Sequence, residues 1–229
     1  MRSLDAIHFC YRNFRATQFT VEQFKKHFPE SKVALIVDKG GLDFTEYSNS
    51  AGLYVVDNND YNLGGTGPNA YLESHRAISL ANRIKRALEQ LDAENVLILE
   101  DDVYVKQRFE VSPNIIPAGQ ITSSNLFPEH ISKKWFGYDT NWGMCGGSIM
   151  NRQFFLSIYE DIIEWTKNHH DSLKQEFNAI GAGDCFMSFH FARHGKRTSL
   201  APWLKDGAVV HPYKNLYPPG WTSENHVEW

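Results

Sequence analysis

Residues 95–103 constrain the fold of this chain more than any other segment. Their sequence, Asn-Val-Leu-Ile-Leu-Glu-Asp-Asp-Val, is an apolar run of strand length that ends in three consecutive acids. A short apolar run bounded by polar residues is typical of a strand buried on both faces of a parallel sheet. Open α/β sheets bind ligands at the carboxyl ends of their strands, which is where Glu100, Asp101 and Asp102 lie. Adjacent carboxylates repel one another, so we expect a bound cation there rather than a solvated turn.

The chain before this strand follows the order of a parallel α/β fold. Residues 6–11, 32–37 and 53–56 have strand patterns, and Thr20 with Gln23 forms a capping box for a helix over residues 21–28. A strand, a helix and a strand at this spacing predict a right-handed βαβ unit with parallel strands. A long helix over residues 69–91 should lie against the sheet, because apolar residues recur along it at helical spacing. These residues are Ala77, Ile78, Ala81, Ile84, Leu88 and Leu91.

Composition excludes several classes of protein. The chain has 229 residues, a net charge of −4 and 14% aromatic residues, so it lacks the basic surface of a nucleic-acid binder and the composition of a disordered chain. No apolar run approaches membrane-spanning length, and no signal peptide precedes the first strand. The three cysteines, Cys10, Cys145 and Cys185, are widely spaced, which favours reduced thiols in a cytoplasmic protein. A Golgi enzyme without its anchor would have the same features.

The acidic triplet and the elements around it resemble a known family. Leu99-Glu100-Asp101-Asp102 resembles the D-x-D signature, here in its E-D-D form, of glycosyltransferases with the GT-A fold. The resemblance covers most of the chain and implies an α/β, GT-A-like (Rossmann-like) fold with a mixed, mostly parallel central sheet flanked by helices. Residues 1–229 would form a single glycosyltransferase domain, either whole or part of a longer protein. Residues 1–110 would then be the nucleotide-binding half and residues 111–229 the acceptor half.

The same resemblance implies a metal site. Asp102 would bind Mn²⁺ or Mg²⁺, which holds the diphosphate of a nucleotide sugar, and Glu100 or Asp101 would face the ribose or a metal-bound water. His211 follows a short strand near the end of the chain and matches the histidine that closes the metal site in many such enzymes. A lone histidine beside a proline is usually structural, so its proximity to Asp102 would decide between the two roles.

Further residues are assigned to the nucleotide sugar. By resemblance Tyr11 and Arg12 line the nucleotide and Asp38 contacts the base, although an aspartate before two glycines is equally typical of a turn. His75 and Arg76, at the start of the long helix, could point at the diphosphate, and Lys214 could balance its charge. Gly146 and Gly147 permit close approach to the backbone and would lie beside the donor sugar.

Asp184 is the predicted catalytic residue. It follows Gly181-Ala182-Gly183 at the start of a helix over residues 184–194, where it is also suitable as an N-cap. Glycosyltransferases of this family carry an acid at this place, and in inverting members it takes the proton of the acceptor. We therefore favour catalysis over capping.

Other polar and aromatic groups have ordinary explanations. The aromatic segment 135–143 either stacks on sugar rings or forms a second hydrophobic cluster. His169 and His170 are predicted in a solvated loop or helix end. His190 and His194 have the i, i+4 spacing of a zinc site, but without the glutamate of a zincin motif they are better explained as core and surface histidines. Residues 112–132 are predicted to be rich in loops.

The sequence predicts a metal-dependent glycosyltransferase that moves a sugar from a UDP-sugar to a glycan or glycoprotein acceptor. The E-D-D motif and the helix with Ser74 and His75 resemble lipooligosaccharide galactosyltransferases. The compact build also resembles enzymes of large DNA viruses, which would act in the host cytoplasm. One alternative is a sugar nucleotidyltransferase, but residues 11–14 lack the Gly-rich loop of that class. The other is a catalytically silent domain that binds a sugar or a nucleotide.

Overall fold

A mixed, mostly parallel sheet forms the centre of the protein. The computed structural model describes residues 4–10, 14–37, 43–57, 71–121 and 125–211. Within them the strand order of the sheet is β3-β2-β1-β4-β7-β6-β8, in which β1 to β4 run parallel and β7 is antiparallel to β4 and β6. The strands are β1 (Leu4–Cys10), β2 (Val33–Val37), β3 (Tyr54–Asp57), β4 (Asn95–Leu99), β6 (Ala118–Gly119), β7 (Ile149–Asn151) and β8 (Ser199–Leu200).

The predicted acidic strand is a central strand of this sheet. All five residues of β4 are buried, as expected for a strand covered on both faces. Its register against β1 runs from Leu4 opposite Asn95 to His8 opposite Leu99. Because the two strands are parallel, their carboxyl ends lie at the same edge of the sheet. The acids that follow Leu99 therefore emerge at the edge where an α/β fold binds its ligands.

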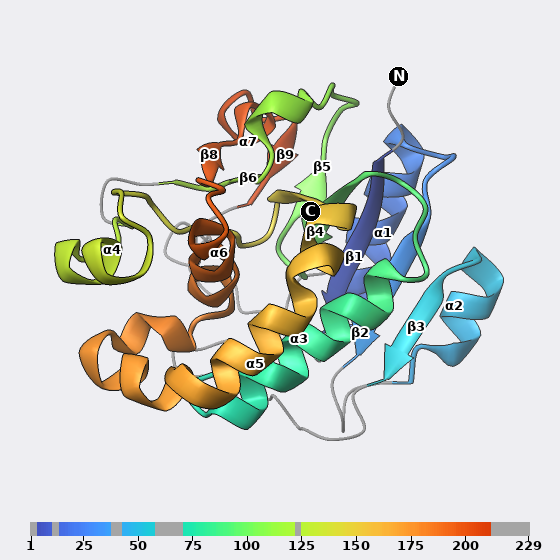
Figure 1. Cartoon of the computed structure of the whole chain (residues 1–229). Helices are drawn as coiled ribbons and strands as arrows, with labels where there is room; N and C mark the ends of the chain where they lie inside the picture. The colour runs from blue at the N-terminus through green and yellow to red at the C-terminus, as the bar shows by residue number, and fades with distance from the viewer. Residues whose placement is uncertain (1–3, 11–13, 38–42, 58–70, 122–124, 212–229) are drawn as a thin grey trace, which may run out of the picture.

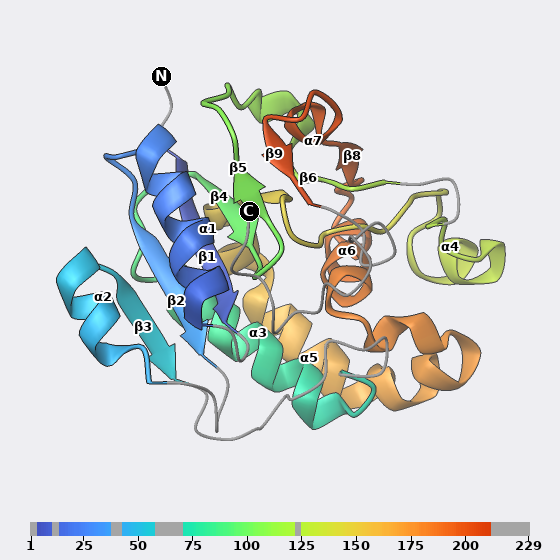
Figure 2. The ribbon, with the colours of Figure 1, turned by 180° about the vertical axis from the view of Figure 1, so that it is seen from behind.

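Helices cover both faces of the sheet. Figures 1 and 2 show α3 and α5 on one face and α1 on the other. The side chains of β4 alternate between these faces, because Ile98 belongs to the core cluster with α3 and α5 whereas Leu97 and Leu99 belong to the cluster with α1. The described helices are α1 (Phe14–His27), α2 (Thr45–Ala51), α3 (Ser74–Leu88), α4 (Glu129–Trp135), α5 (Arg152–Glu176), α6 (Gly183–Arg193) and α7 (Pro202–Lys205). None of them is long and apolar enough to cross a membrane.

Two predicted helix starts are wrong. Helix α1 begins at Phe14, so Thr20 is an interior residue and not an N-cap; its hydroxyl donates to the carbonyl of Thr17 at 3.1 Å. A buried partner on β1, His8, contacts the same hydroxyl at 2.6 Å, which explains a threonine at this position. The helix expected from residue 69 is described only from Ser74 onward, and its predicted apolar face is buried apart from the half-buried Ile78.

Local sequence patterns also predicted less helix and strand in the second half of the chain than the structure contains. His169 and His170 lie inside α5, not in a loop, and the buried His170 contacts the carbonyl of Tyr71 through Nε2 at 2.9 Å. The interval 112–132 contains a short 3₁₀ helix (Pro113–Ile115), strand β6 and the start of α4. These elements are short and are held by contacts with distant segments, so they lack a periodic pattern of their own.

Candidate metal and active site

Two of the three consecutive acids converge on a histidine from the far end of the described chain. Nε2 of His211 lies 3.6 Å from Oδ1 of Asp102 and 4.0 Å from Oε2 of Glu100. One ligand atom from each of these three residues lies within 4.8 Å of the others. The cluster therefore joins the end of β4 to His211, which was predicted as a metal ligand from its position in the sequence alone.

A small antiparallel ladder brings His211 to the acids. Strand β5 (Tyr104–Val105) follows the acidic turn, and β9 (Val209–Val210) pairs with it so that Tyr104 faces Val210. The next step of this register places His211 opposite Val103, beside Asp102. The turn itself is closed by a hydrogen bond from the Val103 amide to the Glu100 carbonyl at 3.0 Å.

The donor set of this cluster fits a divalent cation. Carboxylate oxygens and imidazole nitrogen are the ligands that Mn²⁺ accepts, and the oxygens also suit Mg²⁺. Adjacent ligands of an octahedral ion are about 3 Å apart, so the two separations from His211 need to contract by about 1 Å at most, and no separation within the cluster by more than about 2 Å. Side-chain exposure is 9% for Asp102, 14% for His211 and 25% for Glu100, so all three side chains are largely shielded from bulk solvent.

The middle acid points to a different partner. Oδ1 of Asp101 accepts a hydrogen bond from the hydroxyl of Thr17 on α1 at 3.0 Å, and both residues are buried. Asp101 therefore contacts helix α1, while Glu100 and Asp102 on either side of it lie close to His211.

A thiol lies on the other side of the histidine ring. Sγ of Cys145 is 3.8 Å from Nδ1 of His211 and donates to Oε1 of Gln120 at 3.5 Å. Burial, together with the charges of Glu100 and Asp184, raises the pKa of Cys145 well above its usual value, so the group is a neutral thiol. Its contact with Nδ1 leaves Nε2 of His211 facing the two carboxylates.

The paired glycines border this cluster and are packed by the protein's own side chains. A Cβ atom on Gly146 would meet Cγ2 of Val103 at 2.3 Å and Cδ of Glu100 at 3.1 Å. Gly147 has a φ of +82°, and its carbonyl accepts a hydrogen bond from Nε1 of Trp203 at 2.7 Å. The close approach expected at these glycines therefore exists, and at Gly146 it makes room for the carboxyl group of Glu100.

Asp184 lies in the first turn of α6 but is not its N-cap. Ala182 occupies the N-cap position, and Oδ1 of Asp184 accepts from the amide of Cys185 at 2.9 Å. Burial raises the pKa of Asp184, against the lowering effect of the amide. Its charge also contributes to the raised pKa of Cys145, which relates it to the thiol beside His211. A raised pKa is what a general base needs to take a proton near neutral pH.

The remaining predicted residues lie either on α3 or outside the part of the chain that the structure describes. His75 and Arg76 lie in the first turn of α3 with exposed side chains. Tyr11, Arg12, Asp38 and Lys214 lie outside the described residues. Cys145, which contacts His211, and Gln120, which accepts from Cys145, were not assigned to the site from sequence, because neither belongs to a motif and only the tertiary contacts identify them.

The aromatic segment 135–143 packs against the hydrophobic core and against α6. The Trp135 ring packs edge-on against Trp165 at 5.0 Å between ring centroids, and Phe136 packs against Phe189 at 5.2 Å. These two residues therefore belong to the hydrophobic cluster that was one of the two alternatives. The hydroxyl of Tyr138 donates to the carbonyl of Ala192 at 2.7 Å, which ties the segment to α6.

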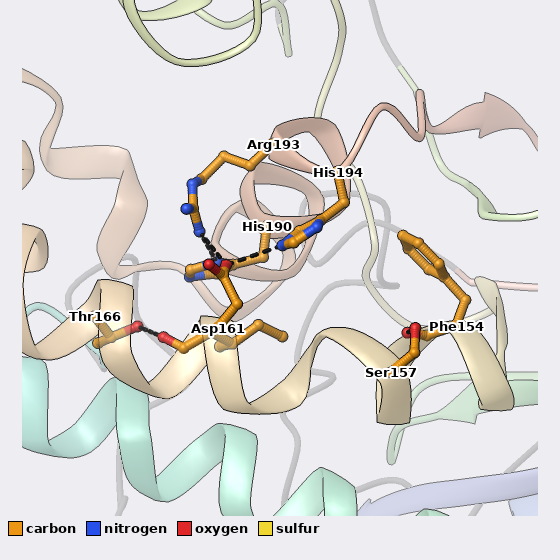
Figure 3. A network of polar contacts seen from close by, with 8 residues as sticks. Phe154, Ser157, Asp161, Thr166, His190, Arg193 and His194 are labelled. Atoms are coloured by element: carbon orange, nitrogen blue, oxygen red, sulfur yellow. Dashed lines mark hydrogen bonds and ion pairs between the residues drawn. The ribbon is translucent and has the colours of Figure 1, made fainter.

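The histidines of α6 are structural, as expected. His190 is fully buried, and its Nδ1 lies 3.3 Å from Nη1 of Arg193. His194 contacts Oδ2 of Asp161 through Nε2 at 2.9 Å, and Arg193 binds the same oxygen at 2.8 Å (Figure 3). The i, i+4 pair is thus divided between the core and an ion-pair network that joins α6 to α5.

Comparison with solved structures shows that this fold is shared with a glycosyltransferase. The apo form of GlyE, a glycosyltransferase from Streptococcus pneumoniae TIGR4, superposes with a TM-score of 0.51 at 13% identity, covering 90% of this chain and 49% of that chain. The chain has a glycosyltransferase fold. It spans about half the length of the GlyE chain, and S. aureus TarS matches at a TM-score of 0.38 and 15% identity over 80% of this chain and 34% of that one. No protein-family model and no curated protein matches the sequence.

Proposed function

We propose that this protein is a metal-dependent glycosyltransferase that moves a sugar from a UDP-sugar to a glycan or glycoprotein acceptor. The observation that supports this most is the convergence of Glu100, Asp102 and His211 at the carboxyl end of β4 in a glycosyltransferase fold. In this cluster the acidic motif, which is expected to bind a nucleotide sugar, lies beside His211. No local sequence pattern connects the two.

The donor is held through charge. Asp102 and His211 would hold Mn²⁺ or Mg²⁺, with Glu100 directed at the same ion or at a water bound to it. The bound cation would stabilise the negative charge that develops on the diphosphate leaving group. Asp102 is only 7% exposed, so its carboxylate acts where water screens charge weakly. Gly146 leaves space for the Glu100 side chain, because a Cβ atom at this position would overlap Val103 and press on Glu100.

The acceptor is activated by a base. Asp184 would take the proton of the attacking hydroxyl if the configuration at the anomeric carbon is inverted. Its raised pKa makes the ionised carboxylate a stronger base. The neutral thiol of Cys145, close to the charges of both Asp184 and Glu100, adds no further negative charge between the two.

A thermal-shift experiment tests the metal-dependent donor site. We expect UDP to raise the melting temperature in the presence of Mn²⁺, to have little effect without it, and to act more strongly than other nucleoside diphosphates. Asp102→Ala should abolish the shift. Asp92→Ala is the matched control, since Asp92 is 78% exposed at its side chain and pairs with Lys32 at 2.7 Å. A UDP shift that survives Asp102→Ala contradicts the assignment.

Two activity measurements separate the enzyme from its alternatives. Slow, Mn²⁺-dependent release of free sugar from a UDP-sugar such as UDP-glucose is expected from a glycosyltransferase without its acceptor. A silent binding domain would bind UDP and release nothing. A nucleotidyltransferase would instead release pyrophosphate from UTP and a sugar 1-phosphate, and this result would replace our proposal.

A further inference from the structure

Asp101, the middle acid of the triplet, is hydrogen-bonded to α1, the helix on the face of the sheet opposite α3 and α5. Asp101 is 5% exposed and Thr17 is fully buried, and the hydroxyl of Thr17 donates to Oδ1 of Asp101 at 3.0 Å. A hydrogen bond to an ionised group is stronger than one between neutral partners, and removal of the donor from a buried carboxylate is costly. This contact connects α1 directly to the turn that carries the metal-binding acids.

A buried chain of hydrogen bonds continues from this contact into β1. The Thr20 hydroxyl donates to the carbonyl of Thr17 at 3.1 Å, so the 2.6 Å contact with Nε2 of His8 requires the imidazole to be the donor. Nδ1 of His8 then accepts, and Sγ of Cys10 lies 3.5 Å from it. Burial lowers the pKa of His8 to about 3, which keeps the ring neutral and this direction of donation unchanged.

We propose that Thr17 is a positioning residue for the metal site and that it acts through Asp101. Asp101 lies between Glu100 and Asp102, so a hydrogen bond that holds its side chain also restrains the backbone of the turn from which their side chains project. With Asp101 held against α1, its neighbours face His211 on the opposite side of the turn. Without the anchor, three adjacent carboxylates can relieve their repulsion by rotating apart, which separates the two oxygens that a cation must contact together.

This inference rests on the proposed metal site, and it assigns Asp101 a role different from contact with the ribose or a metal-bound water. A residue that orients a metal ligand changes metal affinity by about 10- to 100-fold when it is removed. Thr17→Val retains the shape of the side chain and removes the donor. We expect this variant to bind Mn²⁺ about tenfold more weakly than the wild type, and Thr17→Ser, which keeps a hydroxyl, to recover most of the affinity.

Thr166→Val is the matched control for a buried hydroxyl in a helix. Thr166 is fully buried in α5 and donates to the carbonyl of Ile162 at 2.6 Å (Figure 3). Its loss should reduce stability, although by less than Thr17→Val because the acceptor is a neutral carbonyl, and should leave Mn²⁺ affinity unchanged. Mn²⁺ binding is measured by EPR titration of the full chain with the metal alone, and circular dichroism at the same temperature gives the fraction folded. Equal Mn²⁺ affinity of Thr17→Val and the wild type overturns the proposal.

A double-mutant cycle tests whether Thr17 acts through Asp101. Asp101→Ala should weaken Mn²⁺ binding, and the double variant Thr17→Val/Asp101→Ala should bind no more weakly than Asp101→Ala alone. Additive losses would mean that Thr17 affects the site by another route and would overturn the proposal. If Thr17→Val does not fold, Thr17→Ala/Asp101→Ala compared with Asp101→Ala gives the same test, and unchanged Mn²⁺ binding in Asp101→Ala alone also overturns the proposal. Failure of the wild type to bind Mn²⁺ would instead reject the proposed function.

Discussion

Nε2 of His211 lies 3.6 Å from Oδ1 of Asp102, although the two residues come from opposite halves of the chain. The pairing of β5 with β9 creates this contact, because β5 follows directly after the acidic turn and β9 ends directly before His211. The proposed cation site therefore depends on a two-residue ladder that is separate from the central sheet. Variants of the ladder and of the residues at its ends should affect metal binding before they affect the core.

Replacement of His211 should weaken Mn²⁺ binding. His211→Ala removes the only nitrogen ligand of the cluster, so we expect at least about a tenfold loss of affinity, or about 1.4 kcal/mol. Isothermal titration with Mn²⁺ measures the change. His130→Ala is the control, since His130 is an exposed histidine of α4. Unchanged binding in His211→Ala would remove His211 from the metal site.

A methyl group at Gly146 should disturb the same cluster. In Gly146→Ala the new Cβ atom would overlap Cγ2 of Val103 and press on Cδ of Glu100, so we expect weaker Mn²⁺ binding together with lower stability. Gly195→Ala controls for the loss of stability: its φ of +74° strains any larger residue, but open space surrounds it. If both variants bind Mn²⁺ equally, the space at Gly146 has no role in the site.

Replacement of Asp184 should separate catalysis from binding. Asp184→Asn keeps an acceptor for the amide of Cys185 and removes the base, so the rate of sugar transfer to an acceptor should fall about 100-fold or more. Binding of UDP and Mn²⁺ should change little. Transfer measured with a radiolabelled UDP-sugar, beside thermal shifts with UDP, gives the two quantities. A variant with full transfer activity would exclude Asp184 as the base.

The stability of Asp184→Asn relative to the wild type should increase as the pH rises. Burial raises the pKa of Asp184 in the folded protein above its usual 3.8. Ionisation of Asp184 therefore opposes folding when the pH is above the pKa of the folded state, and it has no effect when the pH is below the pKa of the unfolded state. The free energy of unfolding of Asp184→Asn should thus exceed that of the wild type at pH 7, and the two should converge at acidic pH. Urea unfolding at both pH values tests this. Asp139→Asn, at an exposed position, should show no such gain.

The ion-pair network between α5 and α6 should contribute to stability rather than to transfer. Burial alone would raise the pKa of Asp161, but hydrogen bonds from His194 and Arg193 outweigh it and lower that pKa (Figure 3). The stabilisation is therefore present above the unfolded pKa and is lost as the pH falls through the lower folded value. Because the side chain of Asp161 is 46% exposed, Asp161→Asn should cost only about 0.5–1 kcal/mol at pH 7.

Urea unfolding at pH 7 and at acidic pH measures this contribution. Glu164→Gln, an exposed change on the same helix, is the control and should leave stability nearly unchanged. Equal stability of Asp161→Asn and the wild type at pH 7 would mean that solvent screening cancels the ion pairs. Transfer activity should be the same in both variants, because none of these residues contacts the cluster around His211.

Local patterns in the sequence predicted the sheet well. The apolar runs at β1, β2 and β4 and the helical spacing in α3 correctly indicated parallel strands with a helix packed on them. Burial requires an apolar residue at each of these positions. The pattern can therefore be recognised without knowing which segment packs against it. The capping box at Thr20 was wrong because a buried threonine that bonds to His8 has the same residue type as a helix cap.

The sequence by itself determined that an acidic turn follows a buried parallel strand, because the strand's hydrophobicity and the acids are local properties. Only the tertiary structure decided which acids act together. It directs Glu100 and Asp102 toward His211 and turns Asp101 toward Thr17, and it places Cys145 against the far nitrogen of the imidazole. These contacts join residues far apart in the chain, and the strand pairing and side-chain directions that create them leave no periodic trace in the sequence.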